Sequence, residues 1–293
     1  MQFVVFILVF PIIWLISVLP FRLFYIFSDF VCLLVYNVFG YRKKVVRQNL
    51  AMALPHLSDK ERLNIEKKFY RHMCDMFLEM VKTMNISEKQ IKNRFRFTNL
   101  DVYLDMEKQG KSIALLCAHY ASYEWVISMN YYSNIEGYGI YKKINNKYFD
   151  RLVKKIRSRF KATLITTKET IPTLEKNFRS HHLGLYGFAS DQSPQVSRTH
   201  HWAKFMGIEV PVHTGAEMLA KRFDMNMIFL RVKKVKRGYY EATLELMAEN
   251  PKSVPNYEIS DDFLRRVEQQ IYEAPEYYLW THKRWKHRRK TTA

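Results

Sequence analysis

The chain is poor in glycine and in cysteine, and each shortage limits what it can be. Only 9 of its 293 residues are glycine, so glycine-rich loops that cradle phosphate groups are scarce. Its three cysteines, Cys32, Cys74 and Cys117, are odd in number and scattered. Because Cys32 and Cys117 lie inside apolar runs, we interpret all three as reduced packing residues in a cytoplasmic compartment.

Signs of a division into several parts are also missing. The sequence contains no internal repeat, no low-complexity segment and no linker rich in serine or glycine. A chain of 293 residues is long enough for one large α/β domain or two small ones, with a full core.

Acidic residues are outnumbered, with 28 Asp and Glu against 47 Lys and Arg, for a formal net charge of +19. So large a surplus predicts work beside an anionic partner. Three kinds of partner fit: nucleic acid, a phospholipid surface, and an acidic carrier or substrate. Composition alone does not choose among them.

The N-terminus narrows that choice. Residues 3–19 (FVVFILVFPIIWLISVL) carry no charge and would span about 25 Å as a helix. A second apolar segment, residues 21–39, carries only Arg22 and Asp29. A buried hairpin of core helices is the alternative, whereas a signal peptide would need a basic start and a small-residue cleavage site. We therefore predict that residues 1–40 form a membrane anchor and an interfacial apolar helix.

Basic residues follow this segment directly, at Arg42, Lys43, Lys44 and Arg47. Positive charge beside a membrane span marks the cytoplasmic side of the bilayer. We therefore expect residues 41–293 to form one domain that faces the cytoplasm.

The next two helices are predicted by their first residues. Residues 58–84 carry apolar side chains at helical spacing, and Ser58 with Glu61 forms a capping box at the start. Ser87 opens a second, shorter helix in the same way.

After Gly110 short apolar runs alternate with helical patterns. This alternation predicts an α/β fold, with a mixed, mainly parallel sheet flanked by helices. Residues 239–246 alternate in polarity, which predicts an antiparallel edge strand. The predicted buried strands are residues 112–117, 162–166, 183–189 and 227–232, and the predicted helices are residues 148–160, 171–178 and 214–223.

Two of the predicted strands end in polar residues, and chemistry in such sheets lies at the carboxyl ends of strands. His119 and Glu124 follow the first strand, and Asp191 and Gln192 follow the third. With Glu124 in the first turn of the next helix, its carboxylate would accept a hydrogen bond from one imidazole nitrogen of His119. The other nitrogen would then serve as a base for a hydroxyl proton. Taken alone, the spacing is better explained by a buried histidine that a carboxylate holds for structural reasons.

Five ordered segments make the pattern specific. CAHYASYEW, around His119 and Glu124, resembles the histidine-x4-acid block of the glycerolipid and lipid A acyltransferase superfamily. The other four resemble segments of the lipid A late acyltransferases, the lauroyl and myristoyl transferases of Gram-negative inner membranes. The resemblance covers residues 20–288, and its motif style is similar to that of the Bacteroidetes-type branch. The four segments are YRKKVVRQNLAMALP, YKKINNKYFDRLVKKIRSRFKA, DQSP with KFMGIEVPVHTGAEMLAKR, and APEYYLWTHKRWKHR.

The resemblance implies a glycerolipid acyltransferase-like fold at the bacterial inner membrane. It implies transfer of a fatty acyl chain from an acyl carrier protein or CoA thioester to a hydroxyl of a lipid A precursor or related glycolipid. His119 is implied as the general base and Glu124 as the residue that orients it. Arg157 is implied as a contact for the acceptor's phosphate or for developing charge. The other matching residues, expected to bind substrate, are Asn146, Asp150, Asp191, Gln192, Thr214 and Gly215.

The residues themselves add two points to what the resemblance implies. Asp191, at a strand end, is as well suited to tying down a loop as to touching substrate. No Gly-x-Ser-x-Gly elbow occurs, which argues against an acyl-enzyme on serine and for direct attack by the acceptor hydroxyl.

We expect no metal, no cofactor and no nucleic acid. The adjacent pairs at residues 181–182 and 200–201 are histidines, but neighbouring side chains point apart in both helix and strand. The basic run at residues 283–290 contains Trp285, as nucleic-acid sites often do. No nucleic-acid motif accompanies it, and the run equally suits anionic lipids of the inner leaflet.

Two alternatives stay open at this point. A lysophospholipid or aminolipid O-acyltransferase would use the same His–Glu dyad. A basic, membrane-bound protein that binds nucleic acid or anionic lipid without catalysis would need neither the dyad nor the polar end of the third predicted strand.

Overall fold

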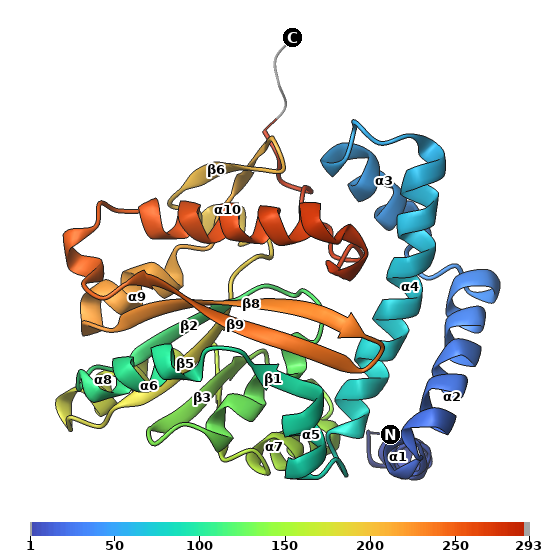
Figure 1. Ribbon diagram of the computed structural model, residues 1–293, viewed down its shortest axis with the longest axis horizontal. Helices are drawn as coiled ribbons and strands as arrows, with labels where there is room; N and C mark the ends of the chain where they lie inside the picture. Colours follow the sequence, from blue (N-terminus) through green and yellow to red (C-terminus); the bar gives the residue numbers. More distant parts are fainter. Residues whose placement is uncertain (1, 290–293) are drawn as a thin grey trace.

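The computed structural model describes residues 2–289, which build a seven-stranded sheet covered by helices (Figure 1). The strand order is β1-β9-β8-β2-β5-β3-β4. Five strands run parallel to one another, while β9 is antiparallel to β8 and β1 is parallel to β9. The expected mixed, mainly parallel sheet is therefore confirmed. The strands are β1 (Phe95–Phe97), β2 (Ile113–Cys117), β3 (Glu136–Tyr141), β4 (Ala162–Thr166), β5 (Gly184–Ala189), β8 (Asn226–Lys236) and β9 (Tyr239–Ala248).

The central strand is β2, which pairs with β5 on one side and β8 on the other. All five of its residues are buried, as expected of an apolar run in a parallel sheet that helices cover on both faces. The four predicted strand runs coincide with β2, β4, β5 and β8.

Three strands of the large sheet differ from the sequence prediction, and one of them, the short β1, was not predicted. The segment predicted as an antiparallel edge strand is β9, which is antiparallel to β8 but lies one position inside the edge, because the short strand β1 pairs with its outer side. Strand β3 was not predicted at all. It contains Gly137 and Gly139, which lower strand propensity, yet a Cβ at Gly139 would lie 2.9 Å from Leu164 on β4.

Two of the helices, α4 and α5, begin at the capping residues that the sequence signals gave, whereas α6 and α10 were not predicted. Ser58 and Ser87 each form a full capping box, with Glu61 and Gln90 respectively. The hairpin of β6 (Trp202–Phe205) and β7 (Ile208–Pro211) forms a separate two-stranded sheet. The helices are α4 (Asp59–Lys82), α5 (Glu88–Arg94), α6 (Leu100–Lys108), α7 (Lys147–Ser158), α8 (Thr170–Arg179), α9 (Gly215–Phe223) and α10 (Glu258–Glu273).

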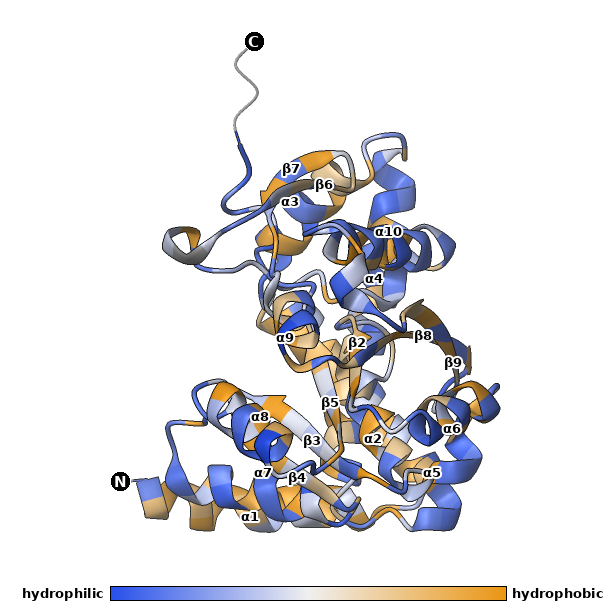
Figure 2. Cartoon of the chain, turned by 90° about the vertical axis from the view of Figure 1, so that its left-hand side faces the viewer, coloured by the Kyte–Doolittle hydropathy of each residue, from blue (hydrophilic) through white to orange (hydrophobic). Residues whose placement is uncertain are grey.

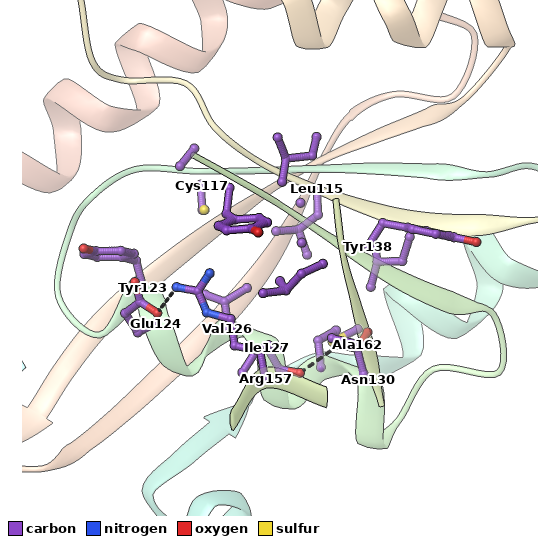
Figure 3. Close-up of a pocket in the computed structure, with 18 of the residues that line it drawn as sticks. Leu115, Cys117, Tyr123, Glu124, Val126, Ile127, Asn130, Tyr138, Arg157 and Ala162 are labelled. Carbon is purple, nitrogen blue, oxygen red and sulfur yellow. Dashed lines mark hydrogen bonds and ion pairs between the residues drawn. The ribbon is translucent and has the colours of Figure 1, made fainter. Parts of the chain in front are cut away.

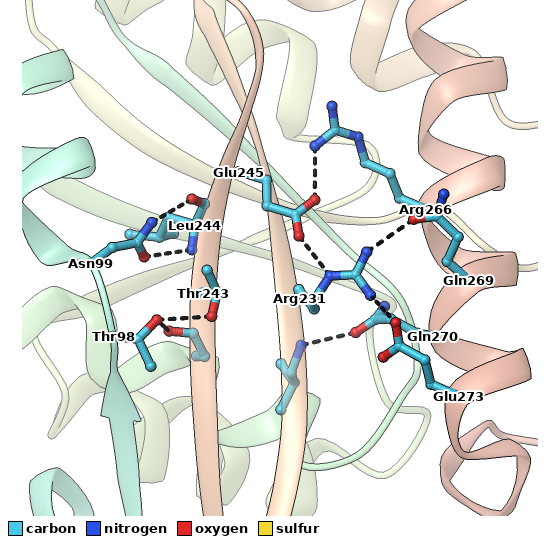
Figure 4. A network of polar contacts seen from close by, with 12 residues as sticks. Thr98, Asn99, Arg231, Thr243, Leu244, Glu245, Arg266, Gln269, Gln270 and Glu273 are labelled. Atoms are coloured by element: carbon cyan, nitrogen blue, oxygen red, sulfur yellow. Dashed lines mark hydrogen bonds and ion pairs between the residues drawn. The ribbon is translucent and has the colours of Figure 1, made fainter.

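Polar contacts fix the long β8–β9 hairpin to its neighbours (Figure 4). The side-chain amide of Asn99 donates to the carbonyl of Leu244 at 2.8 Å and accepts from its N–H at 2.9 Å. On the other side of β9, Glu245 accepts from Arg231 of β8 at 2.6 Å and from Arg266 of α10 at 2.8 Å. These contacts hold the sheet and α10 in one unit.

Three N-terminal helices pack along α4 at one side of the sheet (Figure 1). They are α1 (Gln2–Val18), α2 (Phe21–Leu33) and α3 (Lys43–Ala53), and a π-helical turn, η1 (Leu34–Val38), extends α2. Apolar residues run along α1 (Figure 2), which also packs on α7 through contacts of Phe6 with Tyr148 and Phe149.

The second apolar segment, rather than the first, forms the helix that is long enough for a membrane span. Among the described helices, one is long and apolar enough to cross a membrane, and it comprises residues Phe21–Val38. The first apolar run forms the 17-residue α1, which is shorter. The second run has the required length because the π-helical turn continues α2 without a break, and its Asp29 is paired with Arg237 of the hairpin at 2.8 Å.

Candidate active site

The loop after β2 holds His119 at the carboxyl end of the central strand. Strand β2 ends at Cys117, and a 3-10 helix, η2 (Tyr123–Tyr131), begins after the turn. Within the turn Ala121 has a φ of +49°, a left-handed conformation that non-glycine residues seldom adopt. Such backbone persists only where its surroundings hold it in place.

The C-terminal segment provides that support. The N–H of Ala121 donates to the carbonyl of Tyr277 at 2.9 Å, and the N–H of Leu279 donates to the carbonyl of His119 at 3.1 Å. A bridge between Tyr120 and Tyr278 adds a third contact. The segment beginning at η5 (Pro275–Tyr277) therefore sets the position of the His119 loop.

Asp191 is the carboxylate that binds the imidazole. It follows β5, the strand beside β2, and its Oδ1 accepts from Nδ1 of His119 at 2.7 Å and from the backbone N–H at 3.1 Å. The side chain of Asp191 is 1% exposed and that of His119 is 17% exposed. Because a carboxylate only accepts, this contact places the proton on Nδ1 and leaves Nε2 free to accept one.

The electrostatics of the pair follow from this burial. Desolvation by itself disfavours the imidazolium, but the charge and hydrogen bond of Asp191 outweigh it, and the more distant Glu124 adds to them. The pKa of His119 is therefore raised above its ordinary value. Burial likewise opposes the charge of Asp191, but His119 outweighs it, and the pKa of Asp191 is lowered.

Glu124 has a different partner from the expected one. It lies in the first turn of the helix after His119, as predicted, but its Oε2 accepts from Nη2 of Arg157 at 2.7 Å. The expected hydrogen bond from His119 to Glu124 is replaced by the bond to Asp191, because the pairing of β2 with β5 brings the two strand ends together. Glu124 instead joins η2 to α7.

His119, Glu124 and Arg157 line a cavity of about 310 Å³ beside the sheet (Figure 3). Figure 3 shows the Glu124–Arg157 pair at one side, next to Tyr123, with Cys117 and Leu115 nearby. Burial raises the pKa of the Cys117 thiol to about 12, so it is not a thiolate nucleophile at neutral pH. The apolar part of the lining includes Leu115, Val126, Ile127, Met129, Ile140, Ala162, Leu164, Leu185 and Ala189.

Comparison with known proteins agrees with this arrangement. Residues 1–287 match the family described as bacterial lipid A biosynthesis acyltransferase. The chain belongs to this family. It is also 22% identical over 279 residues to the lipid A biosynthesis lauroyltransferase of Escherichia coli (strain K12), covering 94% of this chain and 90% of that protein.

Membership in the lipid A acyltransferase family settles the class of the protein. The protein is an acyltransferase, and the family supports acyl transfer to a lipid A precursor. The alternative of a binding protein without catalysis is therefore wrong.

Two residues of the family-like segment at residues 141–162 support the helix that carries Arg157. Asn146 caps α7, since its Oδ1 accepts from the N–H of Tyr148 at 3.0 Å. The buried carboxylate of Asp150 accepts from the hydroxyl of Tyr141 at 3.1 Å and from a backbone N–H at 3.0 Å. Their polar atoms are used inside the protein, so they position α7.

Thr214, Gly215 and Gln192, which also match the family, are not part of the cavity lining. Thr214 is the N-cap residue of α9 and Gly215 is its first residue, while Gln192 directly follows Asp191. Of the candidate residues in the described chain, the lining contains His119, Glu124 and Arg157.

Tyr123 is a site residue that sequence reasoning missed. Its ring meets the imidazole of His119 edge to face, with 4.8 Å between centroids. The ring contacts the same imidazole that Asp191 binds and limits its rotation. The only signal in the sequence was that Tyr123 lies between His119 and Glu124, a position that it shares with Tyr120.

Proposed function

We propose that this acyltransferase moves a fatty acyl chain from an acyl carrier protein or CoA thioester to a hydroxyl of a lipid A precursor or related glycolipid. The observation that carries the proposal is His119, which is held by the buried Asp191 and lines an apolar cavity with one imidazole nitrogen free to accept a proton. A base beside a hydrocarbon-sized cavity suits an acyl thioester with its carbonyl at the base.

The chemical step uses His119 as general base. The acceptor hydroxyl gives its proton to Nε2 of His119 as its oxygen attacks the thioester carbonyl carbon. The carbon–oxygen bond forms and the carbon–sulfur bond then breaks, and the proton passes from the imidazolium to the departing sulfur. Asp191 stabilises the imidazolium through the 2.7 Å hydrogen bond and fixes the ring.

The Glu124–Arg157 pair, which lines the same cavity, serves the same step. Arg157 faces the cavity that His119 lines and uses one nitrogen for Glu124, so its guanidinium can face the oxyanion or an acceptor phosphate. Glu124 holds Arg157 in place, and its charge also favours the imidazolium of His119.

The cavity beside the sheet holds the donor acyl chain. Its lining is mostly apolar, and Gly187 keeps space open at β5. A Cβ at Gly187 would be in ordinary contact, 3.8 Å from the nearest backbone oxygen, so a larger side chain there would reduce the cavity without disrupting the sheet.

The protein works at the cytoplasmic face of the bacterial inner membrane. Residues 21–38 form the candidate span, and large apolar side chains such as Leu8 and Ile26 are exposed on α1 and α2. The net charge of +19 suits anionic lipids of the inner leaflet and an acidic carrier protein.

Transfer by the purified full-length protein tests this proposal. The protein in nanodiscs receives either an acyl carrier protein thioester or acyl-CoA, with a lipid A precursor, and the products are identified by mass spectrometry. We expect one added acyl chain, absent with His119→Ala and present with His56→Ala, which changes an exposed histidine elsewhere. No transfer from either thioester, or transfer only to a lysophospholipid or aminolipid, would contradict the proposal.

A further inference from the structure

A second apolar cavity, of about 320 Å³, lies next to the first. Glu124, Ile127 and Arg157 line both cavities, while His119 lines only the first. The Glu124–Arg157 pair is thus part of a wall between them. The rest of the second lining comes from α1, α4, α7 and the residues next to them, and includes Ile13, Met80, Val81, Met84, Phe149, Leu152, Val153 and Ile156.

Away from the Glu124–Arg157 pair, the lining offers a ligand almost no hydrogen bonds. The pair forms one polar edge of the cavity, and the hydroxyl of Thr83 donates to the carbonyl of Met80. A cavity of this kind favours neither water nor a polar group, because both would lose hydrogen bonds there. It fits a hydrocarbon chain.

The position of the second cavity indicates where such a chain comes from. One of its walls is α1, which packs on α7 and exposes the apolar Leu8 and Ile12 on its outer side. With α1 at the bilayer, as the proposed function has it, hydrocarbon would reach Ile13 along α1 without crossing water. The first cavity differs because His119 and the basic Lys142 line it. These polar groups suit the thioester end of a donor that a water-soluble carrier brings.

We propose that the second cavity binds an acyl chain of the lipid acceptor, so that the enzyme holds donor and acceptor chains at the same time. The inference rests on the proposed function. The chain lies along α1 and α7, and its polar end reaches the Glu124–Arg157 pair, which brings the acceptor hydroxyl toward His119. The ion pair separates the two chains and keeps the donor chain from entering the acceptor cavity.

Two neighbouring residues of α1 provide a matched pair of variants. Ile13→Trp fills the second cavity, whereas Ile12→Trp makes the same change at a side chain that is 58% exposed. Gly187→Val fills the first cavity instead. Each variant is assayed with a long-chain lipid A precursor, with an analogue that has the same headgroup and butyryl chains, and with carrier thioesters from octanoyl to palmitoyl.

We expect Ile13→Trp to raise the KM for the long-chain acceptor by at least about 10-fold relative to Ile12→Trp, since each excluded methylene costs a few-fold in binding. With the butyryl acceptor the two variants should turn over alike. The donor chain-length optimum should stay unchanged in Ile13→Trp and move to shorter chains in Gly187→Val. Melting temperatures establish that all variants are folded.

The outcomes separate this inference from the proposed function. A shorter donor optimum in Ile13→Trp would overturn the inference, because the second cavity would then hold the donor. Equal behaviour of Ile13→Trp and Ile12→Trp toward the long-chain acceptor would overturn it too. In both cases the wild-type enzyme still transfers acyl chains. A folded wild-type protein that acylates no lipid would refute the proposed function itself.

Discussion

Replacing Asp191 by Asn removes the charge behind His119 while keeping the shape of the side chain. The carboxylate oxygen Oδ1 accepts from both the backbone N–H and Nδ1 of His119, at 3.1 and 2.7 Å. An amide supplies one oxygen and one donor group. If its NH₂ faces Nδ1, the ring proton moves to Nε2, and no base is left for the acceptor hydroxyl.

The size of the loss follows from the burial of the pair. A hydrogen bond to a charged partner contributes about 1.5–3 kcal/mol, and the 1% exposure of Asp191 leaves little solvent to screen it. Losing that support for the imidazolium costs about 10- to 100-fold, at roughly 1.4 kcal/mol per factor of ten. With the wrong tautomer added, we expect kcat to fall by about 10²- to 10⁴-fold.

The pH profile shows whether Asp191 acts through the imidazole. Asp191 holds the pKa of His119 above its ordinary value, and the base works only when neutral. Wild-type kcat should therefore rise with pH through that raised pKa. In Asp191→Asn the pKa falls, so the acidic limb of the profile should move to lower pH even though the maximum is smaller.

Release of carrier thiol, measured with and without acceptor lipid from about pH 5 to about pH 9, gives both kcat and the position of the acidic limb. Asp261→Asn is the matched control. Asp261 binds His201 at the same distance of 2.7 Å, but this pair does not line the cavity. It should leave kcat and the profile unchanged. Near-normal kcat and an unmoved acidic limb in Asp191→Asn would refute the reasoning. If Glu124→Gln then caused a severe loss of kcat, Glu124 rather than Asp191 would be the carboxylate that supports His119.

Three further expectations concern the ion pair, the membrane and the donor. Glu124→Gln and Arg157→Gln should each lower kcat by at least about 10-fold, and the double variant should cost little more than either, as coupled groups do; additive losses would contradict the coupling. Protein lacking residues 1–20 should stay with membranes through alkaline carbonate and leave in detergent, because residues 21–38 remain; carbonate extraction would exclude a span. Activity with the carrier thioester should fall with added salt more steeply than with acyl-CoA, and equal slopes would contradict docking of the carrier to the basic surface.

The parts of the fold that the sequence predicted are those specified by local signals. Strand β2 is an unbroken apolar run, and Ser58 and Ser87 carry complete capping boxes. Strand β3 escaped prediction because Gly139, which lowers strand propensity, is required by close packing on Leu164. Its signal lies in the neighbouring strand rather than in its own residues.

The site could be predicted only in part for the same reason. Local spacing identified His119 and suggested Glu124 as its partner. The actual partner depends on register: Cys117 of β2 lies beside Ala189 of β5, which brings Asp191 to the imidazole from 72 residues away. The 3-10 helix after His119 leaves Glu124 to meet Arg157. No pattern within one segment contains that information.

Turnover of His119→Ala, measured together with its melting temperature, tests the central claim most directly. Loss of the base should lower kcat for acyl transfer by about two to four orders of magnitude, while folding and membrane binding stay normal. A histidine that Asp191 holds only for structure would give the opposite pair of results, a lower melting temperature and near-normal turnover per folded molecule. A folded His119→Ala protein that transfers acyl chains at the wild-type rate would contradict the mechanism.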